Sequence, residues 1–322
     1  MGIDVKTPRR LYKYRDFSNR TLDMIISDNV YFADPSTFND PLDTRPSLEV
    51  DLDEGQLEDV VRKFVERRTL AEMSTAARSI RYRGPKTMDH IERQSRRQAE
   101  RLIKDIQYSV SNSDYDSAEY KCFLLCRYIE EELLRQYDKG IVSFAERATC
   151  PLMWSHYGDQ HRGICIGYSA LANLEDLYKV RYGGSRSVGA GNVAAMLRGN
   201  VVARRQVDEA VLLRKAASWR YEREWRLIGP RGCQNSPLEM EEIVFGIRCR
   251  SSAKYTVMKA LKGRDRPLKF YEMREVPGTF RLKKYTLSYD DELFIHFPRR
   301  SLSLLEQFEN RSATVPSKSK VD

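Results

Sequence analysis

The sequence has few of the residues that build metal sites and disulfide scaffolds, and it has no long apolar run. Six cysteines are scattered along the chain without a CxxC, and none combines with the four histidines at zinc-finger spacing. No stretch approaches the roughly 18 apolar residues that a membrane helix needs. These absences argue against a disulfide-stapled or membrane protein. We expect no metal and no membrane partner.

The N-terminal stretch MGIDVKTPRRLYKYR also lacks something, namely the apolar segment of a secretory signal. Together with the unpaired cysteines, this predicts a cytoplasmic protein in a reducing environment. The 322 residues are 41% hydrophobic and 31% charged, which is typical of a globular chain with a large core.

Positive charge is in excess and unevenly placed. The chain has a net charge of +9, and residues 60–105 contain 13 Lys or Arg but 6 Asp or Glu. A basic patch attracts polyanions, so this stretch favours a nucleic acid or an acidic protein as a partner. A solvated helical face is the alternative interpretation. The candidate residues for nucleic-acid binding are Arg93, Arg96, Arg97 and Arg101.

Hydrophobic periodicity predicts an α+β chain in which strands surround a helical block. Strands are expected at 9–15, 29–35, 140–146, 163–169, 178–184, 221–228, 241–247, 268–273 and 280–287. Helices are expected at 19–28, 54–137 (with breaks at 84–85 and 112–114), 192–199, 206–216 and 252–263. We predict one domain over 1–310, a mixed and strongly bent sheet, a helical insertion at about 54–137 and a disordered polar tail at 311–322.

Scarce side chains are concentrated in the run LMWSHYGDQHRGICIGY, residues 152–168. The chain has three Trp and four His, yet Trp154, His156 and His161 fall within eight positions together with Ser155 and Tyr157. One interpretation is that these side chains line a ligand-binding site with aromatic rings and hydroxyl groups. The other is structural, with Trp154 in the core and both histidines satisfied by neighbours.

A second unusual run is WRYEREWRLI. In an extended strand its side chains alternate, so that Glu222, Glu224 and Arg226 share one face and Trp225 and Leu227 the other. Two interpretations stay open for the charged face. It is either a solvated ladder of ion pairs or a pair of carboxylates in a reactive site.

In order along the chain, several blocks resemble the bacterial DUF2971 family. They are LYKYR with LDMIISDNVYFADPSTFNDPLD, then VSFAE with LMWSHYGDQHRGICIGY, then KAASWRYEREWRLI and IVFGI. The resemblance spans most of residues 11–247. The helical block and the C-terminal tail lie outside these motifs.

The layout is also similar to the core of ADP-ribosyltransferases, especially their DNA-targeting toxin branch. This resemblance implies NAD as a substrate, no metal, and a toxin or phage-defence effector that modifies nucleic acid or protein. It implies Glu224 as the carboxylate that stabilises the cationic ribose and Glu222 as the one that orients the acceptor. The NAD-binding residues that it implies are Tyr12, Tyr14, Arg15, Trp154, Ser155, His156, Tyr157 and His161.

Within this hypothesis each NAD-binding side chain has a chemical task. A flat ring, Tyr157 or Trp154, would orient the nicotinamide. Arg15 would pair with the diphosphate, because a guanidinium binds phosphate oxygens in a bidentate manner.

Two other classes of function remain. Asp40, Asp43, Glu224 and His156 would converge on Mg²⁺ in a nuclease, since Mg²⁺ prefers carboxylate oxygens. In FNDPLD, however, Asp40 and Asp43 are also the residues expected to stabilise a turn. The third class is a non-catalytic interaction protein in which all the scarce residues are structural.

Overall fold

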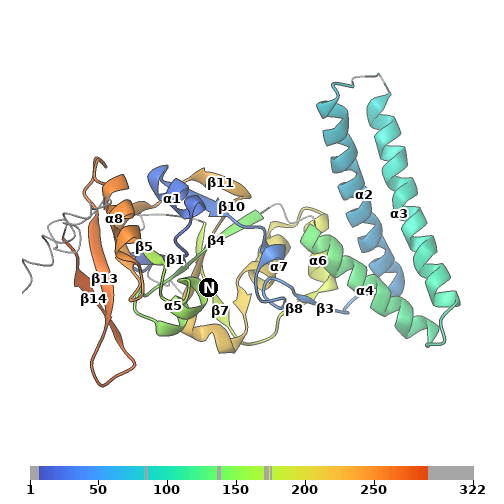
Figure 1. Ribbon diagram of the computed structural model, residues 1–322. Coiled ribbons are helices and arrows are strands. Elements are labelled where there is room, and N and C mark those ends of the chain that lie inside the picture. The colour runs from blue at the N-terminus through green and yellow to red at the C-terminus, as the bar shows by residue number, and fades with distance from the viewer. Residues whose placement is uncertain are drawn as a thin grey trace, which may run out of the picture.

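The computed structural model describes residues 7–82, 84, 86–135, 139–169, 174 and 176–288. Its centre is an eight-stranded mixed sheet (Figure 1). In spatial order the strands are β14 (Leu282–Thr286), β13 (Lys269–Glu275), β12 (Glu239–Phe245), β5 (Ile164–Ser169), β1 (Arg10–Arg15), β4 (Lys139–Ala145), β10 (Glu224–Pro230) and β6 (Leu177–Lys179). The expected mixed α and β architecture is therefore confirmed.

All neighbouring strands of this sheet run antiparallel except β12 and β13, which are parallel and joined by the helix α8 (Ser251–Ala260). Strand β1 pairs with β5 along its whole length, from Arg10↔Ser169 to Arg15↔Ile164. Its other edge meets β4 in a single register pair, Tyr12↔Ala145. The sheet is therefore weakly joined between β1 and β4, and polar backbone and side chains are accessible at that seam.

The helical block consists of α2 (Glu54–Ser79), α3 (Thr87–Ser111) and α4 (Ser117–Arg135). Helix α2 begins at a capping box, in which Asp53 accepts from the Gln56 N–H and Gln56 bonds back to Asp53. The breaks expected near 84–85 and 112–114 fall between these helices. In Figure 1, α2 and α3 form a hairpin that projects away from the sheet.

The base of this block shares a core with the rest of the chain. Leu57, Val61 and Phe64 of α2 pack with α4 and with the helices α6 (Ala190–Leu197) and α7 (Val201–Leu212). Ile141 and Ile228 of the sheet belong to the same cluster. The insertion is thus anchored to the strands through α6 and α7. No helix within the described residues is both long and apolar enough to cross a membrane.

The two faces of the sheet are covered differently. One face packs with α1 (Asn19–Ile26) and α8 and buries Leu11, Tyr168, Trp225 and Phe245 among its members. The other face packs with the short helix α5 (Pro151–Tyr157), against Tyr14, Cys165 and Met273. Ser18 caps α1, its hydroxyl accepting from the Thr21 N–H.

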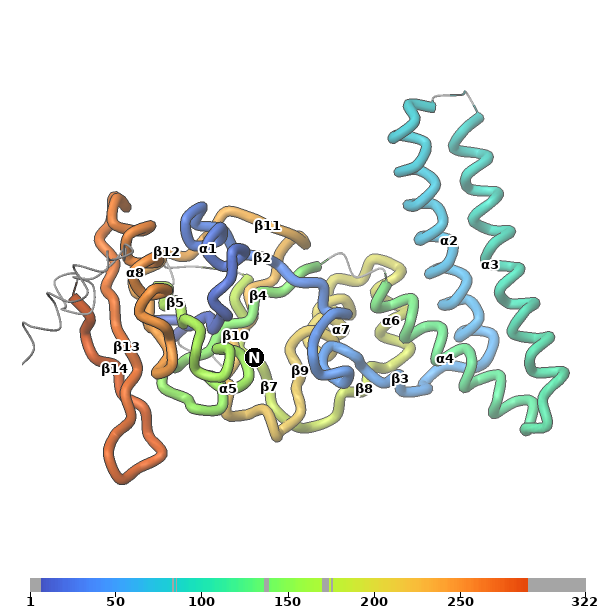
Figure 2. The backbone as a smooth tube through the Cα atoms, viewed as in Figure 1, coloured from blue at the N-terminus to red at the C-terminus, as the bar shows by residue number. Residues whose placement is uncertain are grey.

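Short two-stranded ladders hold the remaining segments. They pair β2 (Asn29–Phe32) with β11 (Gly232–Asn235), β3 (Ser47–Glu49) with β8 (Ser187–Gly189), and β7 (Arg181–Tyr182) with β9 (Arg214–Lys215). The ladders place segments near residues 45, 185 and 215 side by side (Figure 2). The strand expected at 178–184 divides into β6 and β7, and β8 follows it as a separate short strand.

The strand expected at 221–228 begins later than predicted. Residues Ala217–Glu222 form a 3-10 helix (η2), and Arg223 adopts a left-handed conformation with φ 48°. Strand β10 starts only at Glu224. The local alternation of polar and apolar residues did not reveal this turn. The tail expected to be disordered at 311–322 lies outside the described residues.

Candidate functional site

A cavity of about 290 Å³ opens beside the seam between β1 and β4. Its walls come from β1, β4, β10, α5 and the segment after β2. The lining residues are Tyr12, Lys13, Tyr14, Ala33, Thr37, Phe38, Asn39, Asp43, Ser143, Phe144, Ala145, Met153, Tyr157, Lys215, Glu222 and Glu224. The cavity thus contains both predicted catalytic carboxylates and three of the predicted NAD-binding tyrosines.

Five buried charged residues form a network at the cavity, and four of them, Asp43, Lys215, Glu222 and Glu224, line it. Lys215 Nζ lies 2.6 Å from Glu222 Oε2, 3.0 Å from Glu224 Oε2 and 3.4 Å from Asp43 Oδ2. Arg226 donates from Nε to Glu224 Oε1 at 2.8 Å and from Nη2 to Asp43 Oδ2 at 2.7 Å. We call this network of Asp43, Lys215, Glu222, Glu224 and Arg226 the acidic cluster. The alternative of a solvated ion-pair ladder is wrong, because the Glu224 and Arg226 side chains are 3% and 0% exposed.

The turn at Arg223 explains how both glutamates reach one cavity. Glu222 ends η2, and the left-handed Arg223 reverses the chain before Glu224 enters β10. Tyr182 stabilises the junction, since its hydroxyl accepts from the Glu224 N–H at 2.7 Å. The two carboxylates therefore flank the Lys215 ammonium from the two sides of a turn.

The acidic cluster carries an excess of one negative charge when all five groups are ionised, because three carboxylates face two cations. Burial alone would raise the pKa of Glu224, but Arg226 and Lys215 outweigh it and lower the pKa to about 2. For Glu222 burial prevails over the attraction of Lys215, so its pKa is raised. Glu224 is therefore ionised near neutral pH, and Glu222 is the carboxylate better able to accept a proton.

Tyr157 links the predicted run 152–168 to this cluster. Its hydroxyl donates to Glu222 Oε1 at 2.7 Å and lies 3.4 Å from Asn39 Nδ2. Burial and the nearby Glu222 raise the pKa of Tyr157, which keeps the phenol protonated as a donor. Both oxygens of Glu222 are thus fixed in place, one by Tyr157 and the other by Lys215.

Aromatic side chains gather close to this point. The His156 ring stacks on Tyr221 with centroids 6.3 Å apart, and Trp219 lies 6.2 Å from His156 and 5.9 Å from Tyr221. Trp219 Nε1 donates to Asp40 at 2.7 Å, and Lys215 Nζ lies 5.2 Å from the Trp219 ring centroid. His156 is exposed, and Trp219 and Tyr221 are half-buried. These three rings form a partly exposed aromatic rim next to Glu222 and Lys215.

The other rare side chains of residues 152–168 stabilise the loop between α5 and β5. Trp154 is fully buried, packs edge-on against Tyr14 with centroids 5.1 Å apart, and donates its indole N–H to Ala148. Three consecutive residues, Asp159 to His161, have φ between 48° and 71°. The His161 ring stacks on Trp154, and its Nε2 lies 3.2 Å from Ser155 Oγ. Trp154, Ser155 and His161 therefore lie outside the lining of the cavity and fix the turn between α5 and β5.

Arg15 also lies outside the cavity lining. It ends β1, where its carbonyl oxygen is packed so closely against Gly163 that a Cβ there would lie 2.1 Å away. Burial lowers the pKa of Arg15, and Tyr168, Arg20 and Asp16 are the charged or polar groups that act on it. The predicted diphosphate contact of Arg15 is therefore not supported by its position. Tyr12 and Tyr14, from the same strand, do line the cavity.

Sequence reasoning missed Lys215, Arg226 and Trp219 as site residues. Asp43 and Arg226 are 183 positions apart, so their contact depends on the tertiary fold and not on local pattern. Lys215 comes from β9, a strand of two residues that is too short to show a hydrophobic periodicity. The one available signal was the density of charged and aromatic residues in KAASWRYEREWR, which pointed to this segment but not to its partners.

Lys13 lies at the seam and was not predicted either. Its ammonium donates to the Ser143 carbonyl oxygen at 2.8 Å, across the seam. Burial and the neighbouring Arg15 lower the pKa of Lys13 to about 7, despite the opposing pull of Glu224. A lysine with this pKa is largely neutral, and hence nucleophilic, slightly above neutral pH.

We expect Lys13 to be acylated in preference to exposed lysines at pH 7.5. About three quarters of its amines would be neutral at that pH, against roughly one in a thousand for a lysine with the usual pKa. Brief treatment with limiting acetic anhydride, followed by peptide mass spectrometry, measures this. Lys63 and Lys104 on the helical block serve as internal references. Equal labelling of all three lysines would contradict the lowered pKa.

The metal-binding alternative finds no support in the geometry. Asp43 and Glu224 do approach each other, but Lys215 and Arg226 occupy the space between their oxygens. Asp40 is bonded to Trp219 instead. Within the part of the chain that the structure describes, no group of three or more His, Cys, Asp or Glu is arranged to hold a metal ion.

The four arginines proposed for nucleic-acid binding, at positions 93, 96, 97 and 101, all lie exposed on α3. They are therefore on the projecting hairpin and not in the cavity. Arg96 makes a long contact of 3.9 Å with Glu92, and Arg93 bonds the Asp89 carbonyl oxygen. Their charges face solvent and remain accessible to a polyanion.

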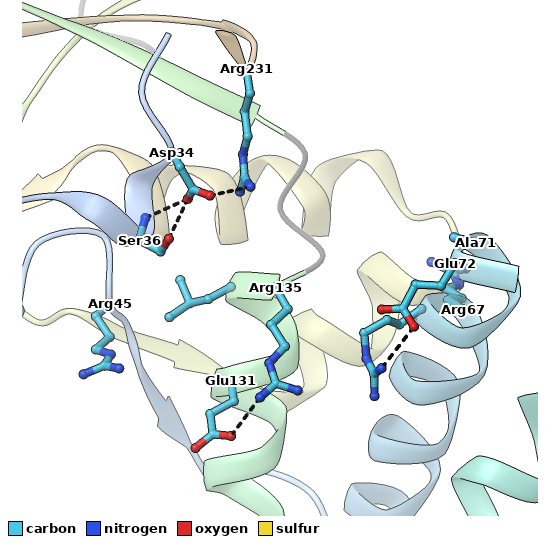
Figure 3. Close-up of a pocket in the computed structure, with 11 residues that line it drawn as sticks. Asp34, Ser36, Arg45, Arg67, Ala71, Glu72, Glu131, Arg135 and Arg231 are labelled. Atoms are coloured by element: carbon cyan, nitrogen blue, oxygen red, sulfur yellow. Dashed lines mark hydrogen bonds and ion pairs between the residues drawn. The ribbon is translucent and has the colours of Figure 1, made fainter. Parts of the chain in front are cut away.

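A larger groove of about 1,110 Å³ separates the helical block from the segment after β2 (Figure 3). It contains several arginines, but most have acidic partners. Arg231 lies 2.6 Å from Asp34, Arg68 pairs with Glu132 at 2.9 Å, and Arg135 lies 3.9 Å from Glu131. These ion pairs compensate most of its positive charge, so the groove offers no concentrated anion site.

Comparison with known proteins finds similarity to a family over part of the chain. Residues 153–227 match a family described as "Protein of unknown function (DUF2971)", which confirms the predicted resemblance for the sequence blocks within that segment. The matched segment contains Tyr157, Lys215, Glu222, Glu224 and Arg226, whereas Asp43 lies outside it. No curated protein and no solved structure matches the chain.

Proposed function

We propose that the chain cleaves the bond between nicotinamide and ribose in NAD and transfers the ADP-ribosyl group to an acceptor. The observation that carries this proposal is the position of Glu222, Glu224 and Tyr157 around one small cavity. Ligand pockets usually measure about 300–1,000 Å³, so this cavity suits one end of a dinucleotide rather than the whole. The nicotinamide riboside end is the reactive one.

The charge of the acidic cluster fits this chemistry. When the bond between the ribose carbon and the nicotinamide nitrogen breaks, the bonding electrons leave with a neutral nicotinamide and the ribose becomes an oxocarbenium-like cation. A fixed negative charge beside the ribose stabilises that cation. Glu224 suits this role, because Arg226 and Lys215 keep it ionised without neutralising the cluster as a whole.

Glu222 suits the second half of the reaction. The acceptor forms a new bond to the ribose carbon and must lose a proton, and a carboxylate with a raised pKa can take it. Tyr157 and Lys215 hold the carboxylate in position. The aromatic rim of His156, Trp219 and Tyr221 provides flat surfaces for a ring of the substrate or the acceptor.

The test is release of nicotinamide from NAD by the purified chain, followed by chromatography. It should be run with water alone, with single-stranded and double-stranded nucleic acid, and with a mixture of acidic proteins. Release in any condition, with a matching mass increase on an acceptor, supports the proposal. No release in any of them would leave the acidic cluster as a structural network.

Nucleic acid is the acceptor that the exposed arginines of α3 favour. Changing Arg93, Arg96, Arg97 and Arg101 to Glu should abolish most nucleic-acid binding at low salt, and wild-type affinity should itself fall steeply as salt rises. The measurement is fluorescence anisotropy with a labelled oligonucleotide at several salt concentrations. A variant with Glu at Arg127 and Arg135, exposed on α4, is the control. Unchanged binding in the α3 variant would favour a protein acceptor.

A further inference from the structure

A second, smaller pocket lies directly behind the acidic cluster. It has a volume of about 180 Å³ and is lined by Leu42, Thr44, Arg45, Gly183, Gly184, Ser185, Arg186, Ala210, Arg214, Lys215 and Ala216. Four of these residues are cationic and none is a carboxylate. We infer that this pocket binds the phosphate groups of a nucleotide, through Arg45, Arg186 and Arg214. We call it the arginine pocket.

The arginines of this pocket are not compensated by acids. Within the described residues, Arg45, Arg186 and Arg214 form no ion pair, in contrast to Arg68, Arg135 and Arg231 of the groove in Figure 3, whose lining Arg45 also joins. The contacts that Arg186 and Arg214 do make are long ones, at 3.4 Å, to the carbonyl oxygens of Arg45 and Gly183. Three guanidinium groups around a small concave space repel one another, and a phosphate or diphosphate would relieve this repulsion with charge-assisted hydrogen bonds.

The loop that carries Gly183 and Gly184 makes room for such a ligand. Both glycines have a left-handed backbone, with φ of 78° and 77°. A Cβ on Gly184 would lie 2.8 Å from Arg214 Nη1, so glycine at this position allows the backbone and the guanidinium to line the same space. Ser185 adds a hydroxyl to the lining. Backbone and side-chain donors therefore converge from two chain segments.

The arginine pocket and the cavity share one lining residue and are lined by neighbouring residues of the sequence. Lys215 lines both, and Asp43 of the cavity is followed by Thr44 of the pocket. Arg214 and Lys215 are consecutive residues of β9, and consecutive strand side chains point to opposite sides. Arg214 thus faces the pocket while Lys215 reaches the acidic cluster. For the donor proposed above, the phosphate groups would be the diphosphate of NAD, and this identification alone rests on the proposed function.

The size of the pocket favours a small ligand over a nucleic-acid backbone. At about 180 Å³ it holds a phosphate or diphosphate but not a whole nucleotide. The rest of the ligand must then lie outside it. This separates the arginine pocket from the exposed arginines of α3, which face open solvent and suit an extended polyanion.

The experiment compares binding of three probes by isothermal titration calorimetry at low salt. The probes are pyrophosphate, ADP-ribose and nicotinamide riboside, which lacks a phosphate. The variant R186Q/R214Q should bind pyrophosphate and ADP-ribose on the order of tenfold or more weakly than the wild type. Its binding of nicotinamide riboside should not change. The control R198Q/R204Q removes two exposed charges outside the pocket and should bind all three probes normally.

Folding and ligand source are checked in the same series. Thermal melting without ligand shows whether R186Q/R214Q is intact, and R186K/R214K keeps the charge while removing the bidentate geometry. Competition between pyrophosphate and ADP-ribose would show that both occupy one site. Pyrophosphate that fails to bind the wild type, or binds R186Q/R214Q equally well, would overturn the inference. Weakened binding of an oligonucleotide with unchanged binding of pyrophosphate would also overturn it.

The outcome separates this inference from the proposed function. If the chain releases no nicotinamide but pyrophosphate binding depends on Arg186 and Arg214, the phosphate site stands and NAD is the wrong nucleotide. If nicotinamide is released and R186Q/R214Q has the same KM for NAD as the wild type, the proposed function stands and the diphosphate does not lie in this pocket.

Discussion

Changing Glu224 to Gln should reduce nicotinamide release from NAD by on the order of 100-fold or more, the effect seen when one preorganised group that stabilises transition-state charge is removed. The substitution keeps the shape of the side chain and an oxygen for Arg226 Nε, which lies 2.8 Å away in the wild type. It also leaves the acidic cluster with two carboxylates and two cations, so the remaining buried charges balance. Because Arg226 and Lys215 favour the ionised form of Glu224, the variant should be less stable than the wild type. The loss in kcat is therefore measured at a temperature at which thermal melting shows the variant to be folded.

Glu242 provides a matched control for this measurement. It is also fully buried and bonded to one arginine and one lysine, Arg10 and Lys284, each at 2.5 Å. It belongs to β12 and does not itself line the cavity, although its carboxylate is bonded to Tyr12, which does. Glu242→Gln should release nicotinamide at the wild-type rate. Equal activity of Glu224→Gln and Glu242→Gln would show that Glu224 has no part in the chemistry.

Glu222→Gln gives a second comparison. Because Glu222 is assigned to the acceptor, this variant should lose transfer to a macromolecule while keeping most of the slower cleavage by water. Wild-type transfer should fall as the pH falls through the raised pKa of Glu222, since a protonated carboxyl cannot accept a proton. A loss of transfer and hydrolysis to the same extent would mean that both glutamates act on the ribose.

Changing Arg226 to Met should destabilise the protein by about 3–5 kcal/mol, the usual cost of removing one partner from a buried ion pair. The guanidinium is completely buried and satisfies Asp43, Glu224 and the Leu212 carbonyl oxygen. Without it, the carboxylates of the acidic cluster share Lys215 alone. Urea unfolding, with the midpoint and slope compared to the wild type, measures the loss.

The exposed Arg127 on α4 is the control, since its ion pair with Glu131 should contribute less than about 1 kcal/mol. A loss of unfolding free energy in Arg226→Met no larger than in Arg127→Met would show that the cluster is hydrated and not a buried network.

The stability of the protein should depend on pH in a definite direction. The pKa of Glu224 falls from 4.5 to about 2 on folding, so its contribution to stability is present above pH 4.5 and is lost as the pH falls toward 2. Arg226→Met should weaken that dependence.

The sequence alone determined the elements whose pattern is local. Helix α2 follows from the periodicity of Leu57, Val60, Val61 and Phe64, because helix packing depends on neighbours three and four residues away. The breaks expected at 84–85 and 112–114 separate it from α3 and α3 from α4. Strands β1, β4 and β5 follow from short apolar runs in the same way. The blocks around Trp154 and Glu224 also pointed to the segment that matches the family model, and to Tyr157, Glu222 and Glu224, which line one cavity.

Only the tertiary structure decided what surrounds those glutamates. The alternation in YEREWRLI is the same for a solvated ladder and for a buried cluster, and the left-handed turn at Arg223 is not encoded by a glycine. Trp154 and His161 serve the loop after α5, because packing against Tyr14 offers the indole a large buried surface. Asp43, Lys215 and Arg226 meet since strand order, which is a property of the whole chain, brings distant segments together. The arginine pocket arises in the same way, from Arg45, Arg186 and Arg214 on three segments.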